Sequence, residues 1–305
     1  MSVHSLQRWS RRPRHSHRAL PAVAAVVVAL AATGCGMPIG PLHGRASDTW
    51  THTYPLSKTG EVTIVNVNGL VEVEGVDGST LEVQAERIAA GVTDQLARDL
   101  LPRILIEEHA TPDFVSIETK RLAGFLIGAS FQVRYHVKAP RTATVRATTV
   151  NGGVTVTAMD GRVIAQTTNG GVVATEINGG IEARTVNGGV RVQLASLSGG
   201  SDSHARVDLT TVNGGVRVAL PETAKATVIA TWVNGGITIS GLHFEVKDES
   251  KRHFEGRLNG GGMPITMTTV NGGITLGSHF DEPIGLRRGR GRGKAGADSS
   301  DLTAR

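Results

Sequence analysis

A chain of 305 residues is long enough for one large domain or two modest ones with a proper core. Its 39 glycines and 4% aromatic residues are untypical of a globular enzyme, whose core relies on aromatic side chains, and they favour thin, repetitive β-structure. The formal charge of +5 does not indicate a nucleic-acid-binding domain, because five arginines precede Cys35 and six basic residues follow Gly285. The body between these ends is net acidic, so no nucleic-acid partner is expected.

Residues 1–34 have the three parts of a secretory signal in order: a positive region, an apolar run over 22–32, and small residues. The run is too short to span a bilayer of ~30 Å hydrocarbon thickness. Ala32-Thr33-Gly34-Cys35 resembles the bacterial lipobox, which implies lipid attachment at Cys35 and a location in the cell envelope. Gly36, rather than Asp, implies the outer membrane if the source is Gram-negative. An ordinary signal peptide, an uncleaved anchor and twin-arginine export through Ser10-Arg11-Arg12 are the alternatives.

A tether is expected over residues 35–50, and alternating strand patterns begin at about Tyr54. Alternating runs flank Asn68-Gly69 and recur around Asp77-Gly78, a strong short-range signal for β-structure. The cysteine at position 35 is the only one, so the fold has no internal disulfide to stabilise it.

One short helix is predicted between Thr93, which can cap it, and Pro102, because leucines recur there at helical spacing. Further strands are predicted over 104–107, 114–119 and 132–137. The apolar, glycine-containing segment 122–131 is either a loop packed on the core or an exposed binding lip, and packing is favoured.

The sequence Asn-Gly-Gly occurs eight times from residue 151 onward, and the corners at 151, 160, 169, 178 and 187 are nine residues apart. Such fixed self-similarity indicates a repeat architecture. Asn and Gly tolerate positive φ and can form corners. The fourth and sixth residues of each nonapeptide are β-branched or small and should point inward. The candidate turn or ladder residues are Asn151, Asp160, Asn169, Asn178, Asn187, Asn213, Asn234 and Asn271.

The nonapeptides predict coils of eighteen residues, two nonapeptides per turn. Asn151, Asn169 and Asn187 would then stack on one edge, and Asp160 and Asn178 on the other, with amides hydrogen-bonded along the stack. An antiparallel meander is the alternative, since Asn-Gly also favours hairpins.

We therefore expect an all-β fold with a parallel, β-helix-like solenoid. The expected divisions are a signal peptide (1–34), the tether (35–50), a β-rich part with one helix (51–140), the repeat solenoid (141–280) and a disordered basic tail (281–305).

The run Gly60–Ile64 through Asn66-Val67-Asn68-Gly69, the repeated Thr-Val-Asn-Gly-Gly, and Leu258-Asn259-Gly260-Gly261-Gly262 resemble the bacterial "putative adhesin" domains of unknown function. The likeness covers roughly residues 50–280. It implies a β-helix-like fold on exported, envelope-associated proteins and supplies no catalytic or ligand-binding residues.

Residues for catalysis or metal binding do not form a convincing set. Calcium-binding nonapeptides need a recurrent Asp, and Asp160 is isolated. No pair of carboxylates recurs on one face as glycoside hydrolysis would require. Asp202-Ser203-His204 is interpreted as a polar loop, and the histidines at 243, 253 and 279 lack the spacing of a zinc site.

The leading hypothesis is a non-enzymatic envelope lipoprotein that acts as an adhesin-like scaffold or binding module, without cofactor or metal. Its expected partners are the membrane, through the lipid, and an envelope polysaccharide or protein. The alternatives are an accessory sensor of envelope stress and a carbohydrate-active β-helix enzyme.

Overall fold

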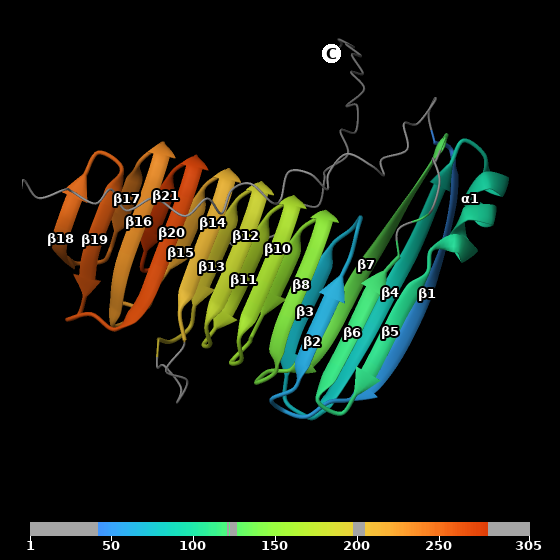
Figure 1. Ribbon diagram of the computed structural model, residues 1–305, viewed down its shortest axis with the longest axis horizontal. Coiled ribbons are helices and arrows are strands. Elements are labelled where there is room, and N and C mark those ends of the chain that lie inside the picture. Colours follow the sequence, from blue (N-terminus) through green and yellow to red (C-terminus); the bar gives the residue numbers. More distant parts are fainter. Residues whose placement is uncertain (1–41, 121, 123–126, 198–204, 280–305) are drawn as a thin grey trace, which may run out of the picture.

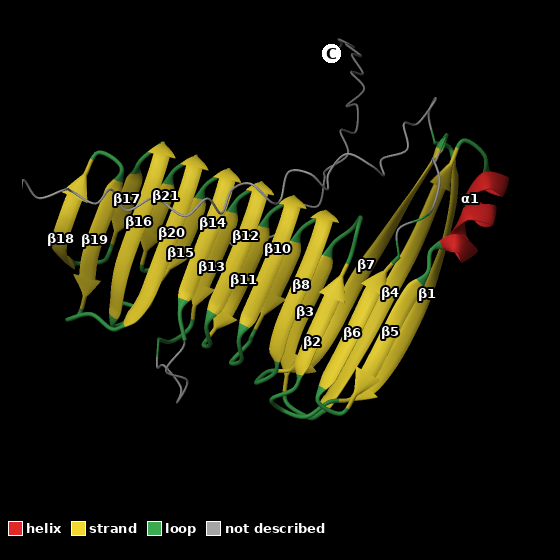
Figure 2. Ribbon diagram, viewed as in Figure 1, coloured by secondary structure: helices red, strands yellow, loops and turns green. Residues whose placement is uncertain are grey.

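The computed structural model describes residues 42–120, 122, 127–197 and 205–279 (Figure 1). Cys35, the signal segment and the basic tail lie outside these residues. The described chain is all-β with one short helix, and its strands form two open, mixed sheets that face each other (Figure 2). We call the ten-stranded sheet A and the eleven-stranded one sheet B.

Sheet A contains, in spatial order, β1 (Gly44–Pro55), β4 (Thr80–Gly91), β7 (Ala129–Pro140), β3 (Val71–Val76), β9 (Val154–Thr157), β11 (Val172–Ile177), β13 (Val190–Leu194), β15 (Val216–Ala219), β21 (Ile274–Gly277) and β17 (Ile237–Ser240). Sheet B contains β18 (Phe244–Ser250), β19 (His253–Leu258), β16 (Ala226–Asn234), β20 (Met263–Asn271), β14 (Val207–Asn213), β12 (Ile181–Asn187), β10 (Val163–Asn169), β8 (Thr144–Asn151), β2 (Glu61–Val65), β6 (Phe114–Thr119) and β5 (Ile106–Thr111).

In the repeat, the chain alternates between the sheets, so that one strand in sheet B and the next in sheet A form one coil. Strand β10 pairs in parallel with β8 and β12, and Asn169 lies opposite Asn151 on one side and Asn187 on the other. Strand β11 pairs in parallel with β9 and β13. Partners in these pairs are eighteen residues apart, as the repeat predicts, except that a register irregularity in β11 brings Ile177 opposite Leu194. The parallel direction excludes an antiparallel meander here.

Alternation along each strand places small β-branched residues and alanines between the sheets. Val154, Val156, Val172 and Ala174 are fully buried, whereas Thr155 and Val173 between them are only partly buried. The inward fourth and sixth positions are therefore confirmed. Small inward side chains explain how so few aromatic residues suffice for a continuous core.

The spatial order of the coils differs from their order in the sequence at both ends. The coil β20–β21 lies between β14–β15 and β16–β17, and β2–β3 lies between β6–β7 and β8–β9. Figure 1 shows the red β20 between the orange β14 and β16. Each sheet contains strands from before and after residue 140 without a break between them, because β2 pairs with β8 and β3 pairs with β9.

The helix is confirmed. Helix α1 (Asp94–Leu100) begins after Thr93, whose hydroxyl oxygen accepts a hydrogen bond from the Leu96 amide at 3.2 Å. A single turn of 3₁₀-helix (Leu101–Arg103) follows and contains Pro102. Ala97 and Leu100 are buried and attach α1 to β1 and β4 at one end of the molecule.

The β-structure begins earlier in the chain than the sequence predicted, with strand β1. It begins at Gly44, inside the expected tether, and pairs antiparallel with β4 over its whole length. The inward residues of its first half include Ala46 and Asp48, so they give no apolar alternation in the sequence. Strand β5 also begins later than predicted, at Ile106, and β7 is longer than predicted. Of the segment 122–131, Leu122 packs against the core and Ile127 is exposed.

Polar contacts join the two sheets at the end where β1 and β5 are the outermost strands. Arg87 donates to an Asp48 oxygen and to the carbonyl oxygen of Ile104, each at 2.8 Å. Glu108 on β5 accepts a hydrogen bond from the Tyr54 hydroxyl on β1 and lies 2.9 Å from Nδ1 of His52. This end of the two-sheet body is thereby closed by side chains.

Candidate functional site

One edge of the molecule carries a column of asparagine side chains, one from each coil. The Nδ2 atom of Asn169 donates to Oδ1 of Asn151, and Asn187 donates to Asn169, at 2.8 and 2.9 Å. An amide can donate and accept at once, so identical side chains link without a break. In spatial order the column is Asn68, Asn151, Asn169, Asn187, Asn213, Asn271 and Asn234.

The glycine after each of these asparagines lies directly against the neighbouring coil. A Cβ atom on Gly170 would lie 2.0 Å from the carbonyl oxygen of Gly152, and one on Gly188 would lie 1.9 Å from that of Gly170. None of the asparagines in the column has positive φ. The column thus depends on close approach of backbones and on amide bonding, rather than on the left-handed asparagine conformation expected from the sequence.

A buried threonine two residues before most of these asparagines links the coils a second time. Thr167 donates to the carbonyl oxygen of Gly152, and Thr185 to that of Gly170, both at 2.7 Å. This role was not predicted from the sequence, although the repeated Thr-Val-Asn-Gly-Gly contained the signal. The same bond is made by Thr149, Thr211 and Thr269.

The opposite corner carries a shorter column. Asn178 donates from Nδ2 to Oδ1 of Asp160 at 2.7 Å, and the Ser196 hydroxyl donates to Asn178 at 2.9 Å. The structure therefore places Asn151, Asn169 and Asn187 on one edge, and Asp160 and Asn178 on the other, as expected. Asn259 belongs to neither column: its φ is 50°, and it donates to the carbonyl oxygens of Glu222 and Ala224 in a turn.

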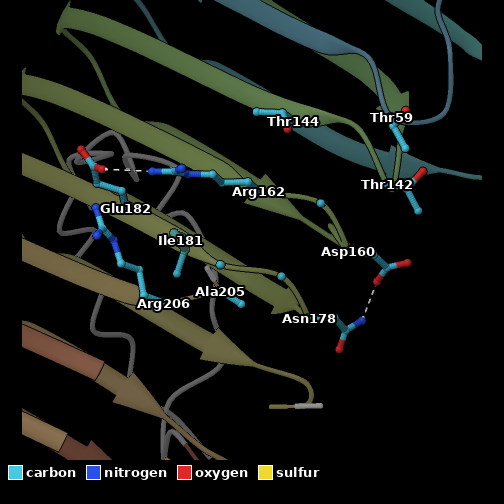
Figure 3. Close-up of a pocket in the computed structure, with 13 residues that line it drawn as sticks. Thr59, Thr142, Thr144, Asp160, Arg162, Asn178, Ile181, Glu182, Ala205 and Arg206 are labelled. Carbon is cyan, nitrogen blue, oxygen red and sulfur yellow. Dashed lines mark hydrogen bonds and ion pairs between the residues drawn. The ribbon is translucent and has the colours of Figure 1, made fainter. Parts of the chain in front are cut away.

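A groove with a volume of about 400 Å³ begins at this second corner and runs along the first residues of β10 and β12 (Figure 3). Asp160 and Asn178 lie at one end, and Arg162, Glu182 and Arg206 at the other. The threonine side of the groove is formed by Thr59, Thr142 and Thr144.

Charges of both signs lie at the arginine end. Glu182 is nearly buried, with 16% of its side chain exposed, and lies 3.7 Å from Arg162 and 3.3 Å from Arg184. Arg206 lies 2.8 Å from Asp208 and leaves 57% of its side chain exposed. The arginines thus keep free surface while the carboxylates hold them in place. This "corner groove" offers guanidinium, amide, carboxylate and hydroxyl groups, which suit a polar ligand with several oxygens.

A broader, shallower depression of about 760 Å³ lies on the outer face of sheet A. Its floor carries Glu72, Glu74 and Glu82 beside His136 and Lys138, and Nδ1 of His136 lies 2.5 Å from Glu72. It therefore differs from the corner groove in having more carboxylates than cations.

Within the described ranges, no three His, Cys, Asp or Glu side chains are arranged to hold a metal ion. His253 lies 3.8 Å from Asp248, and His279 contacts Ser278. The tripeptide 202–204 and Cys35 lie outside the described residues. No helix among those described is long and apolar enough to cross a membrane.

No family model matches the chain, and no curated protein matches it. Among solved structures, a "putative cell adhesion protein" from Clostridium sporogenes aligns with a TM-score of 0.45 and 9% identity, covering 75% of this chain and 99% of that one. A "putative adhesin" from Bacteroides fragilis gives 0.30 and 9%, covering 75% and 97%. A "putative lipid binding protein" from Parabacteroides distasonis gives 0.27 and 10%, covering 75% and 96%. Such low scores and identities do not establish a shared function.

Proposed function

We propose that the chain is a non-enzymatic lipoprotein of the cell envelope, in which a parallel β-solenoid serves as an adhesin-like scaffold that presents polar binding surfaces. The observation that carries this proposal is the parallel pairing of successive coils from β8 to β15, with one register irregularity, between Ala174 and Ile177 on β11. Outward side chains of successive coils recur at the ~4.8 Å strand spacing. A polymer with regularly spaced polar groups can therefore meet several coils at once.

The attachment part of the proposal rests on the lipobox-like sequence before Cys35. Cys35→Ser is expected to move the protein from the membrane fraction to the soluble fraction and to abolish labelling with a fatty-acid probe. Retention of the variant in the membrane would instead indicate an uncleaved apolar anchor.

The binding part rests on the corner groove, because the arginines there retain exposed surface beside fixed carboxylates. The soluble Cys35→Ser chain can be immobilised and exposed to solubilised envelope material. Capture is expected to fall several-fold for the double variant Arg162→Ala and Arg206→Ala.

The matched control is Arg217→Ala, which removes an exposed arginine from the outer face of sheet A. Capture by this control should equal that of the parent. Equal capture by the groove variant and the parent would exclude the corner groove as the binding surface.

A further inference from the structure

Strands β1, β4 and β7 form a ribbon that projects beyond the rest of sheet A. Each has twelve residues, whereas β3 has six and pairs with β7 only over Tyr135–Pro140. Figure 1 shows the ribbon rising past the end of β8, with α1 beside it. At its end Gly44, Gly91 and Ala129 lie side by side in one register. We call the residues at this end the ribbon tip: Leu42–Gly44, Gly91–Thr93 and Ile127–Ala129.

The ribbon tip is apolar and carries no Asp, Glu, Lys or Arg. Ile127 is 68% exposed, the largest fraction for a large apolar residue in the described part of the chain, and Val92 is 38% exposed. The two lie close together, because the Val92 amide donates to the carbonyl oxygen of Gly128 at 2.9 Å. Leu42 is partly exposed as well. Apolar side chains that gather on a projecting end, unlike those scattered singly, mark a contact surface.

The segment that leads to the ribbon tip begins at Cys35, the proposed site of lipid attachment. Its nine residues, 35–43, reach at most about 30 Å when fully extended. They include no Asp, Glu, Lys or Arg, so no charged side chain opposes their approach to a bilayer. A lipid on Cys35 would therefore hold the ribbon tip beside the membrane, at an effective concentration that makes even a weak contact form.

From this geometry we infer that the ribbon tip is a second membrane contact, which places Leu42, Val92 and Ile127 at the boundary between lipid headgroups and acyl chains. The inference rests on the proposed function, because the lipid on Cys35 is what brings the membrane within reach. The partner is a lipid surface rather than a protein. Three apolar side chains cover far less than the roughly 1,000 Å² that a specific protein interface buries.

This contact orients the corner groove. The Val133 amide on β7 donates to the carbonyl oxygen of Asn68 at 2.8 Å, so the ribbon passes the asparagine column on its way to the tip. The corner groove lies at the first residues of β10 and β12, whereas the asparagine column lies at their last residues. A membrane at the ribbon tip therefore leaves the corner groove on the side away from the bilayer, where envelope polymers can reach it.

Fluorescence quenching tests the contact. A chain that begins at Cys35 can be coupled through this thiol, the only one, to a maleimide lipid in phosphatidylcholine vesicles that contain a nitroxide-labelled lipid. Ile127→Trp then places a reporter on the ribbon tip. Its quenching, after subtraction of the parent's signal, is expected to be at least threefold stronger than that of Val246→Trp. Val246 is the matched control, since it is 54% exposed and lies on β18 at the opposite end of sheet B.

A second variant separates the native contact from any affinity of the new tryptophan. Val92→Asp, added to the Ile127→Trp chain, places a charge on the ribbon tip and should reduce the quenching at least threefold. Circular dichroism of each variant checks that the fold is retained. Equal quenching at positions 127 and 246, no quenching at 127, or no effect of Val92→Asp would overturn the inference.

The coupling supplies the attachment to the vesicle whether or not the cell acylates Cys35. The membrane fractionation of Cys35→Ser tests acylation separately. Failure of the ribbon-tip contact and failure of the lipoprotein assignment therefore give different results.

Discussion

At the scale of single residues, each member of the Thr-x-Asn-Gly-Gly sequence has a separate task. The asparagine continues the amide column, the threonine satisfies a carbonyl group of the neighbouring coil, and the first glycine allows two backbones to touch. The glycine requirement at Gly188 is one of space, since the nearest obstacle to a Cβ atom there is the Gly170 carbonyl oxygen.

Gly188→Ala is expected to lower the free energy of unfolding by about 2–3 kcal/mol, because its methyl group would overlap the Gly170 backbone, which cannot rotate away. Gly236→Ala is the control: it changes a glycine of the same motif, and no atom lies within 4 Å of the place that its Cβ would take. Its effect should stay within about 0.5 kcal/mol. Urea denaturation measures both, and equal effects would disprove the close-approach explanation.

The two tyrosines of the chain should ionise only at unusually high pH. Burial raises the pKa of Tyr135 to about 12, and burial together with Glu108 raises the pKa of Tyr54 above its ordinary value. The unfolded chain should titrate near pH ~10. Because the folded-state pKa values are higher, the tyrosines' contribution to stability is complete below pH ~10 and is lost as pH rises through about 12.

Tyrosinate absorbance is therefore expected to appear at higher pH in the native protein than in guanidinium. Tyr135→Phe should also reduce the loss of stability measured by urea denaturation in this alkaline range. Coinciding titration curves for native and denatured protein would contradict the assignment.

At the scale of elements, sheet B gains links between coils beyond its backbone ladder. Each of these inward threonines near the end of a strand donates to a glycine carbonyl group of the preceding coil, so adjacent strands are joined where the chain turns. This arrangement fixes the register of neighbouring coils, because a shift of one residue would turn the threonine outward.

Thr211→Val is expected to destabilise the protein by about 1 kcal/mol or somewhat more. The substitution removes the hydroxyl that donates to the Gly188 carbonyl oxygen at 2.8 Å. Thr210→Val, on the same strand but facing outward, is the matched control and should be nearly neutral. Thermal unfolding distinguishes the two, and a neutral Thr211→Val would show that the bond is dispensable.

At the scale of the whole molecule, the order of the coils makes the C-terminal coil an internal one. Strands β20 and β21 lie between their neighbours and contribute four fully buried apolar side chains, Ile265, Met267, Ile274 and Leu276. The last described coil in the sequence is thus necessary for attaching the coil that precedes it.

A chain that ends at Leu258 still contains residues 226–258, but these residues are expected to become accessible to proteases. Burial of those four side chains alone contributes roughly 6–12 kcal/mol, which is comparable with the stability of a whole domain. A chain ending at His279 keeps both strands and should melt within a degree or two of the parent. If the shorter chain resisted protease equally, the spatial order of the coils would be wrong.

The sequence by itself determined the all-β composition, the position of α1, the inward and outward positions of the repeat, and the offset of eighteen residues. These properties follow from local periodicity, because alternation and a fixed repeat length act within a few residues. They required no knowledge of distant contacts.

Only the tertiary structure decided which coils are neighbours, where β1 begins, and which side chains form the corner groove. Asn271 lies between Asn213 and Asn234, yet every coil carries the same motif and could pair equally well with any other. Strand β1 is held by its pairing with β4 rather than by an apolar pattern of its own. Arg162 and Arg206 are 44 positions apart in the sequence and approach only because the strands that follow them share a sheet. Identical repeats specify how a coil pairs but not with which copy, so the long-range packing at the two ends makes that choice.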